Sequence, residues 1–288
     1  MVILRIDFSS KVGLGHLKRQ EAYIQRKNIK NLIILCKECD EKLTKLPIIK
    51  IKNKEEFFEK IKELKPKEII VDNYNFTCED EKRFKALFPD IKLILFDDTY
   101  EKHCCDEIIN HNLGAKKEKY ANPKIVKVIK PLIRNEFKKV KKRKFKRSGI
   151  FISLGGSDSK NLTIRILKIL KPIKPKVNLY ITSANQNLDK IKKFAFLNRW
   201  VNLYINKGVS LGMAKSKFGI ITPSVISYEA IYMNLPFIAI KTADNQKEVA
   251  KYLKRKYKVI NENEINKIPG LISRRKKRGI KMEKSYKN

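Results

Sequence analysis

Short apolar runs alternate with amphipathic stretches along most of this chain, and few folds accommodate such a pattern. The first half contains four runs rich in β-branched residues, separated by stretches with helical periodicity. The runs are residues 2–8, 31–36, 68–73 and 92–98, and the helical stretches are 15–27, 54–66 and 79–89. Strands that are apolar on both faces and separated by helices indicate a parallel sheet with helices on both sides.

The same alternation returns after a dense basic segment. Residues 138–149, "KKVKKRKFKRSG", are too charged for a sheet to bury, and we interpret them as a solvated linker or helix end. Further strands are predicted at 149–156, 177–183, 201–206, 218–224 and 236–241, and helices at 159–172, 187–197, 225–234 and 246–256. The sequence therefore predicts an α/β protein with two facing Rossmann-like, doubly wound domains, 1–140 and 148–262. A basic C-terminal tail follows at 263–288, and its last part, 274–288, is expected to be loosely ordered.

The charge balance raises the question of a nucleic-acid partner. The chain has 66 Lys and Arg residues against 30 Asp and Glu residues, a formal net charge of +36. Lys and Arg neutralise phosphates, so an excess of this size is common in nucleic-acid-binding proteins. Here the lysines are spread over nearly every predicted helix and loop, without interleaved aromatic residues or zinc-finger spacing. We therefore expect no specific nucleic-acid partner.

Hydropathy and cysteine content bound the location of the protein. No segment approaches the ~18 uncharged apolar residues of a membrane span, and the N-terminal apolar stretch carries Arg5 and Asp7, unlike a signal peptide. We expect a cytoplasmic monomer with no membrane span. The five cysteines form an odd set in a long chain, which favours reduced thiols. Zinc held by "CKEC" (36–39) and "HCCDEIINH" (103–111) is the alternative, but the second cluster lacks matching ligand spacing.

Candidate site residues follow from a rule about doubly wound sheets, whose ligands bind outside the carboxyl ends of the strands. With two facing domains, this edge becomes an interdomain cleft. The first half supplies Ser9, Ser10, Gly13, Gly15, His16, Arg19, Tyr74, Asp97 and Asp98 at or just after strand ends. The second half supplies Gly155, Gly156, Ser157, Asp158, Ser224, Ile226, Ser227, Glu229, Asn245 and Gln246.

Three of these strand-to-helix turns are suited to anions. The turns "GLGH" (13–16), "GGSDSKN" (155–161) and "PSVISYEA" (223–230) each lead into a predicted helix, whose free N–H groups and dipole favour negative charge. None is a Walker loop, and the first turn lacks the third glycine of a dinucleotide fingerprint, with His16 and Arg19 in the helix instead. Together the turns favour a nucleotide diphosphate as ligand.

The order and spacing of these motifs resemble a known family. The segments "SSKVGLGHLKRQ", "VDNYNF", "ILFDD" followed by "HCCD", "SLGGSDSKNLT", "PSVISYEA" and "DNQ" resemble those of the UDP-2,4-diacetamido-2,4,6-trideoxy-β-L-altropyranose hydrolases of the pseudaminic acid pathway. The resemblance covers roughly residues 1–260. It implies a GT-B-like fold, similar to that of the glycosyltransferase that builds lipid II, with the site in the interdomain cleft. It also implies hydrolysis of a UDP-linked sugar in a pathway that supplies flagellin glycosylation.

The resemblance also assigns roles to particular residues. It implies that His16 of "GLGH" and Tyr74 are catalytic, although Asn73 stands where the family often has a histidine. It implies that the turn from Ser224 to Glu229 contacts phosphates through its amides and ribose through its glutamate. Asn245 and Gln246 correspond to the family's trailing "NQ".

The expected chemistry is attack of water on the anomeric carbon. His16 lies at a glycine-lined strand end, and an imidazole can accept a proton at neutral pH. The paired carboxylates Asp97 and Asp98 are an alternative, since many glycosidases use such pairs. The chain has no D-x-D triplet, so we expect no metal and no cofactor, and helix N-termini can stabilise the leaving diphosphate. A UDP-sugar glycosyltransferase of the same fold and a non-catalytic nucleotide-binding module remain alternatives.

Overall fold

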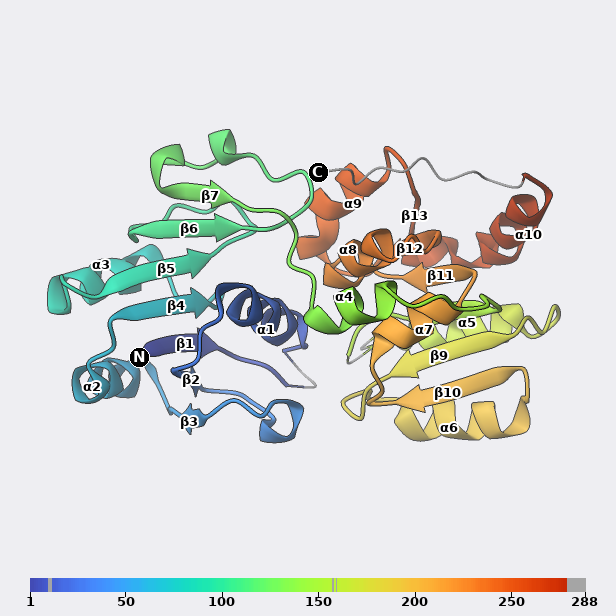
Figure 1. The fold of residues 1–288 in the computed structure, drawn as a ribbon, viewed down its shortest axis with the longest axis horizontal. Coiled ribbons are helices and arrows are strands. Elements are labelled where there is room, and N and C mark those ends of the chain that lie inside the picture. The colour runs from blue at the N-terminus through green and yellow to red at the C-terminus, as the bar shows by residue number, and fades with distance from the viewer. Residues whose placement is uncertain (10–11, 157, 159, 279–288) are drawn as a thin grey trace. The chain divides into compact units, whose positions relative to one another are not determined.

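A computed structural model describes residues 1–9, 12–156, 158 and 160–278, with side chains up to Ser273. It divides into two compact units, Met1–Leu132 and Ile133–Asn288. Each unit is built on one fully parallel sheet with helices on its faces (Figure 1). The prediction of a two-domain α/β fold with doubly wound sheets is therefore confirmed.

The first unit has a seven-stranded sheet in the order β3-β2-β1-β4-β5-β6-β7. Its strands are β1 (Val2–Ile6), β2 (Leu32–Cys36), β3 (Ile48–Lys50), β4 (Glu68–Asp72), β5 (Lys92–Phe96), β6 (Glu107–Asn110) and β7 (Val126–Val128). Its α-helices are α1 (Gly15–Lys27), α2 (Lys54–Leu64) and α3 (Cys78–Leu87). The strand order reverses between β1 and β4, where ligands of such sheets bind.

Alternation along the strands divides the first unit's core into two layers. Ile69 and Val71 of β4 pack into one cluster with Phe57 of α2 and Phe84 of α3. Ile70, between them in sequence, packs into the other cluster with Leu17 of α1. Successive strand residues point to opposite faces, so α1 covers one face while α2 and α3 cover the other.

The second unit repeats this plan with six strands in the order β10-β9-β8-β11-β12-β13. Its strands are β8 (Ile150–Ser153), β9 (Val177–Ile181), β10 (Val201–Ile205), β11 (Phe218–Ile221), β12 (Phe237–Lys241) and β13 (Lys258–Asn261). Its α-helices are α4 (Asn135–Lys141), α5 (Leu162–Leu170), α6 (Leu188–Leu197), α7 (Val209–Lys215), α8 (Val225–Tyr232), α9 (Lys247–Leu253) and α10 (Ile268–Arg278). No helix of the described part is long and apolar enough to cross a membrane.

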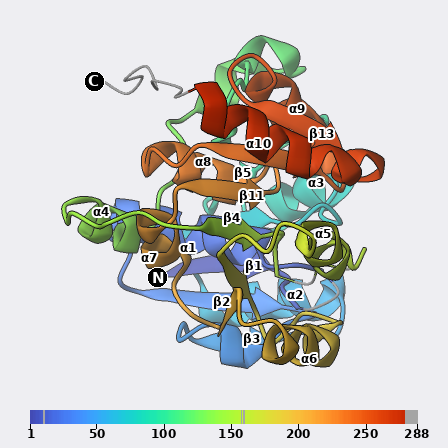
Figure 2. The same ribbon diagram turned by 90° about the vertical axis from the view of Figure 1, so that its right-hand side faces the viewer.

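Two segment boundaries differ from the sequence-based expectation. A tail was expected from residue 263, yet Ile265, Ile268 and Ile272 are buried in the core of the second unit. Helix α10, dark red in Figure 2, therefore extends this unit beyond β13. Apolar residues at this spacing lie on one face of a helix. The many Lys and Arg residues around them made the segment look like a charged tail when it was judged by composition. The first unit ends at Leu132 rather than at residue 140.

Packing at one end and hydrogen bonds at the other anchor the basic segment at 138–149. Helix α4 contacts α7, and Phe137 at its centre is fully buried. Farther along, the guanidinium of Arg147 donates hydrogen bonds to the carbonyl oxygens of Met233 and Asn234, both at 2.8 Å, just beyond the end of α8. The first part of the segment is thus the end of helix α4, as the sequence suggested. The Arg147 contacts anchor the chain just before β8.

The expectation of reduced thiols is wrong for four of the five cysteines. Disulfides join Cys36 to Cys39 and Cys78 to Cys104, whereas Cys105 is free and buried. The second pair is separated by 26 residues in sequence, so only the fold brings its two sulfur atoms together.

Candidate active site

The turn after β1 leaves the start of α1 open. Gly13 has φ of +94°, and its N–H donates to the carbonyl of Ser9 at 2.8 Å. Helix α1 begins at Gly15, and Leu14 at its N-cap provides no side-chain cap. Apart from its chain neighbours, no atom of the described residues lies within 4 Å of a Cβ added at either glycine. Among these residues, the first turn of α1 therefore has free space beside it, and His16 is its second residue.

A buried carboxylate organises the side chains of α1. Asp72, the last residue of β4, is 0% exposed, and its Oδ1 contacts Nδ1 of His16. Arg19 donates from Nε to Oδ2 at 2.6 Å and from Nη2 to Oδ1, and Gln20 donates from Nε2 to Oδ2 at 2.8 Å. Positions 16, 19 and 20 meet on one face of a helix, so all three reach the same carboxylate.

A second carboxylate extends this cluster to Tyr74. Asp98, two residues beyond β5, accepts from Nη1 of Arg19 at 2.9 Å and from the hydroxyl of Tyr74 at 2.9 Å. The Tyr74 ring lies edge-on to the His16 ring, with centroids 4.9 Å apart. The structure thus brings together four of the expected residues, His16, Arg19, Tyr74 and Asp98. We call these four and Asp72 the His16 cluster.

Electrostatics keep Asp72 and Arg19 ionised although both are buried. Burial alone would raise the pKa of Asp72, but Arg19 and His16 hold that pKa far below its usual range. Burial would likewise lower the pKa of Arg19, yet the charges of Asp72 and Asp98 raise it. Burial and the neighbouring Asp98 raise the pKa of Tyr74, so its hydroxyl stays protonated.

Asp97 has a different environment from its neighbour Asp98. Its carboxylate accepts from the N–H and hydroxyl of Thr99, at 3.1 and 2.6 Å, and it lies 3.6 Å from Nε2 of His103. His103 also contacts Glu81 at 2.8 Å. Burial would lower the pKa of His103, but the bonds to Asp97 and Glu81 raise it to about 9. Asp97 and Asp98 therefore do not form a pair facing one site.

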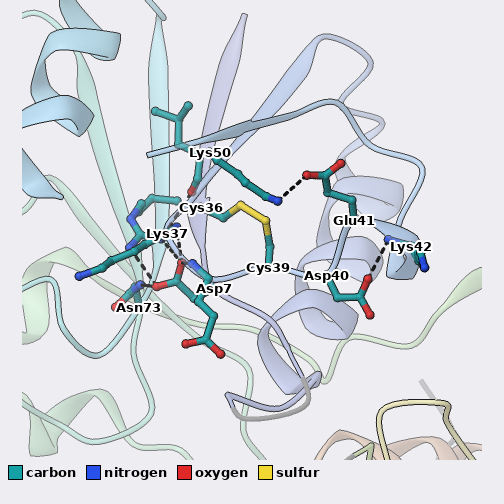
Figure 3. Close-up of a disulfide and its surroundings, with 12 residues drawn as sticks. Asp7, Cys36, Lys37, Cys39, Asp40, Glu41, Lys42, Lys50 and Asn73 are labelled. Carbon is teal, nitrogen blue, oxygen red and sulfur yellow. Dashed lines mark hydrogen bonds and ion pairs between the residues drawn. A yellow bond between two sulfur atoms is a disulfide. The ribbon is translucent and has the colours of Figure 1, made fainter. Parts of the chain in front are cut away.

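Asp7 connects the ends of three strands, β1, β2 and β4, through hydrogen bonds. Its Oδ1 accepts from the N–H groups of Lys37 and Glu38 at 2.7 and 3.0 Å, and its Oδ2 accepts from Nδ2 of Asn73 at 2.7 Å. Figure 3 shows the contacts of Asp7 with Lys37 and Asn73 beside the Cys36–Cys39 disulfide. Asn73 also accepts from the N–H of Asn75 at 2.8 Å. The residue that departs from the family pattern thus fixes the turn that carries Tyr74.

In the second unit, the turn before α5 is capped from within. Asp158 has φ of +44°, and its carboxylate accepts from the N–H groups of Leu162 and Thr163, both at 2.9 Å. Gly155 has φ of +97° with open space around it, and the carbonyl of Gly156 accepts from Thr182 at 2.7 Å. Ser157 lies outside the described residues. An internal carboxylate thus occupies two N–H groups of the first turn of α5.

The turn before α8 has no such cap. Ser224 is the N-cap, but its side chain accepts no capping bond; its hydroxyl lies 3.1 Å from that of Thr222. Ser227 donates to the carbonyl of Ser224 at 2.6 Å, and Ile226 is half-buried in the same turn. The N-terminus of α8 is therefore better suited to an external anion than that of α5.

Glu229 is held by a residue that sequence reasoning missed. It is 1% exposed, and its carboxylate accepts from Nε and Nη2 of Arg134 at 2.6 and 2.9 Å. After β12, Asn245 is exposed, while Gln246 accepts from the N–H of Thr242 at 2.9 Å. Asp72 was also missed. A sequence signal for Asp72 was present, because a carboxylate that ends an apolar strand lies at the sheet edge where ligands bind. Arg134 lies in a basic region, where no sequence signal distinguishes it.

No three or more His, Cys, Asp or Glu side chains of the described residues are grouped as metal ligands. The two units and their turns define a protein of the GT-B glycosyltransferase fold. MurG of Acinetobacter baumannii matches it with a TM-score of 0.61 at 13% identity, over 96% of this chain and 91% of that one. A transferase from Siraitia grosvenorii, solved with UDP, matches with a TM-score of 0.58 at 10% identity, over 96% and 92%.

A comparison of sequences narrows this class. The UDP-2,4-diacetamido-2,4,6-trideoxy-beta-L-altropyranose hydrolase of Campylobacter jejuni is 31% identical over 268 residues, which cover 88% of this chain and 96% of that protein. The chain belongs to the family of these nucleotide-sugar hydrolases. No family model matches the chain.

Proposed function

We propose that this protein hydrolyses a UDP-linked 2,4-diacetamido-2,4,6-trideoxy hexose at the anomeric C1–O bond, with inversion, as a step of pseudaminic acid biosynthesis. Membership of the hydrolase family supports the substrate class. The observation that carries the mechanism is His16, bonded through Nδ1 to a buried carboxylate at an open, uncapped helix start. Free UDP and the free sugar are the products.

The proposed reaction needs one base and one water. The imidazole of His16 takes a proton from water as the oxygen attacks C1 on the face opposite the diphosphate. The C1–O bond breaks, and its electron pair leaves with UDP. Attack from the opposite face inverts the anomeric configuration, and the new hydroxyl oxygen of the sugar comes from water.

Replacement of the base tests this mechanism. His16→Asn keeps a hydrogen-bonding side chain but removes the base, so kcat should fall by about 10²–10⁴-fold. UDP affinity should stay within about twofold in calorimetry, because UDP binding is assigned to residues of the second unit. In ¹⁸O-labelled water, the label should appear in the sugar. Label in UDP, or near-normal turnover of the asparagine variant, would refute the mechanism.

We place the diphosphate at the N-terminus of α8 and the ribose at Glu229. The uncapped first turn of α8 supports the first assignment, in contrast to the capped α5. For the second, Arg134 holds the carboxylate of Glu229 in place, and a carboxylate oxygen can accept a hydrogen bond from a ribose hydroxyl. Glu229→Ala should weaken UDP binding by about 1–3 kcal/mol. Arg134→Leu is the matched control, since it breaks the same ion pair but leaves the acceptor; an equal loss there would argue against the ribose contact.

We also propose that the reaction needs no metal. The support is the missing D-x-D triplet and the helix N-terminus available for phosphate charge. Turnover should therefore survive dialysis against EDTA, and a loss that a divalent metal restores would overturn this.

The fold neighbours keep a second function in view, because glycosyltransferases share this architecture. A transferase would bind the UDP-sugar but need an acceptor, whereas the hydrolase releases UDP with water alone. UDP release from the purified protein without acceptor therefore separates the two. A non-catalytic binding module would release none under either condition.

A further inference from the structure

The contact between His16 and Asp72 determines which ring nitrogen carries the proton. Asp72 is fully buried, and Arg19 keeps it ionised, so its oxygens only accept hydrogen bonds. Nδ1 of His16 lies within bonding distance of Oδ1 and must therefore donate to it. Arg19 Nη2, 3.1 Å from Nδ1, donates to the same oxygen. In the neutral ring, the lone pair is then on Nε2.

Arg19 changes what the carboxylate does to the ring. A second histidine of the same unit shows the contrast. His103 lies between Glu81 and Asp97, which raise its pKa to about 9, so it is a cation at neutral pH. At His16 the carboxylate is bonded twice to Arg19, which also binds Asp98. Among the described residues, the charged and titratable partners of the ring are Asp72, Arg19 and Tyr74, and Asp98 binds the last two of these; the arginine offsets part of the negative charge.

We propose that Asp72 is the positioning residue of the base and that Arg19 adjusts its charge. Asp72 fixes the Nδ1–H tautomer, which leaves Nε2 to take the proton from water. Arg19, bonded to the same carboxylate, offsets part of the negative charge that faces the ring. The inference rests on the proposed role of His16 as base.

Asp72→Asn tests the tautomer. The carboxamide has the same shape but can donate its own N–H to Nδ1, which moves the ring proton to Nε2. Long-range ¹H–¹⁵N NMR spectra should show Nδ1–H in the wild type and Nε2–H in the variant. The kcat should fall by about 10²–10⁴-fold with KM within a few-fold. Asp97→Asn is the matched control, a buried carboxylate beside His103, and should leave both readouts of His16 unchanged.

The NMR readout separates this inference from the proposed function. Nε2–H in the wild type would overturn the inference even if the protein hydrolyses its UDP-sugar. If Nδ1–H is found but no UDP-sugar is hydrolysed, the geometry stands and the proposed reaction fails. An asparagine variant with wild-type kcat would also overturn the positioning role.

Arg19→Gln tests the effect of Arg19 on the charge around the ring. It is a separate variant, so this test does not depend on whether Asp72→Asn folds. It leaves Asp72 facing the ring without its cation, so the acidic limb of the kcat/KM profile and the NMR titration of His16 should move up by about 1–3 pH units. Arg19→Lys keeps the charge and should stay near the wild-type profile, even if the lost fork geometry lowers stability. An unchanged or lowered acidic limb in Arg19→Gln would refute the role of Arg19.

Discussion

Gly13 and Gly15 occupy the same turn but constrain it differently. Gly13 adopts φ of +94°, a backbone conformation that is strained in residues with a side chain. Gly15 starts α1 with ordinary backbone angles, and space beside it is open among the described residues. Gly15→Ala should therefore change stability by less than about 0.5 kcal/mol. If the sugar approaches the backbone here, the added methyl group should still raise KM several-fold.

Gly13→Ala serves as the comparison, because the strained φ should lower stability by about 1 kcal/mol or more. Thermal unfolding and steady-state kinetics of both variants measure the two effects. An unchanged KM in Gly15→Ala would remove the substrate from this turn.

His103 should make the stability of the first unit depend on pH. Its pKa is about 9 when folded and near 6.5 when unfolded, so its ion pairs stabilise the fold fully below pH 6.5. This contribution is lost as pH rises through 9. After a discount for solvent screening, it amounts to about 1–3 kcal/mol. Urea unfolding at pH 6 and pH 9.5 should show the loss in the wild type, and His103→Gln should remove most of it. An equal loss in the variant would contradict the assignment.

At the scale of elements, α5 and α8 both follow a strand-to-helix turn, but only α5 has a side-chain cap on its first turn. Asp158 caps α5, so Asp158→Ala should lower stability by about 0.5–2 kcal/mol. Asp158→Asn keeps an acceptor and removes the negative charge. With the diphosphate at α8, UDP affinity should be the same in Asp158→Asn and wild type by calorimetry. Markedly tighter binding would instead locate the phosphates at α5.

Most elements could be predicted, but the three-residue strands could not. Runs such as 68–73 carry the β-branched pattern of a buried strand, and β4 was found there. Strands β3 and β7 have three residues each, too few for a period to be recognised. Tertiary contacts rather than local pattern stabilise such elements.

Part of the candidate site could likewise be predicted from the sequence, and part could not. Parallel strands end at one edge, so the rule about strand ends was enough to select His16, Tyr74 and Asp98 together. The long-range bonds that hold them in place could not be predicted, although Asp72 stands at a strand end. The bond from Arg19 to Asp72 spans 53 residues and that from Arg134 to Glu229 spans 95, and nothing local encodes either.

At the scale of the whole molecule, the disulfides add stability that composition did not suggest. Closing the loop of 26 residues between Cys78 and Cys104 should contribute about 3–4 kcal/mol, and closing the short loop from Cys36 to Cys39 about 2 kcal/mol. A reducing agent should therefore shift the denaturant midpoint downward. Most of that shift should vanish in a Cys78→Ala, Cys104→Ala variant and persist in Cys105→Ser, which alters the free thiol. Identical unfolding curves with and without reductant would contradict this.

The long sequence separations in the His16 cluster have a consequence for the order of folding. Arg19 reaches its two carboxylates across 53 and 79 residues, and both of these acceptors lie outside α1. While the chain is being synthesised, α1 emerges well before β4 and β5, so Arg19 must stay in water until both strands have been added to the sheet. Contacts of such long range form slowly, because loop closure precedes any gain. The side chains around His16 are thus assembled late, together with the centre of the sheet, and a nascent chain that ends before Asp98 cannot contain this site.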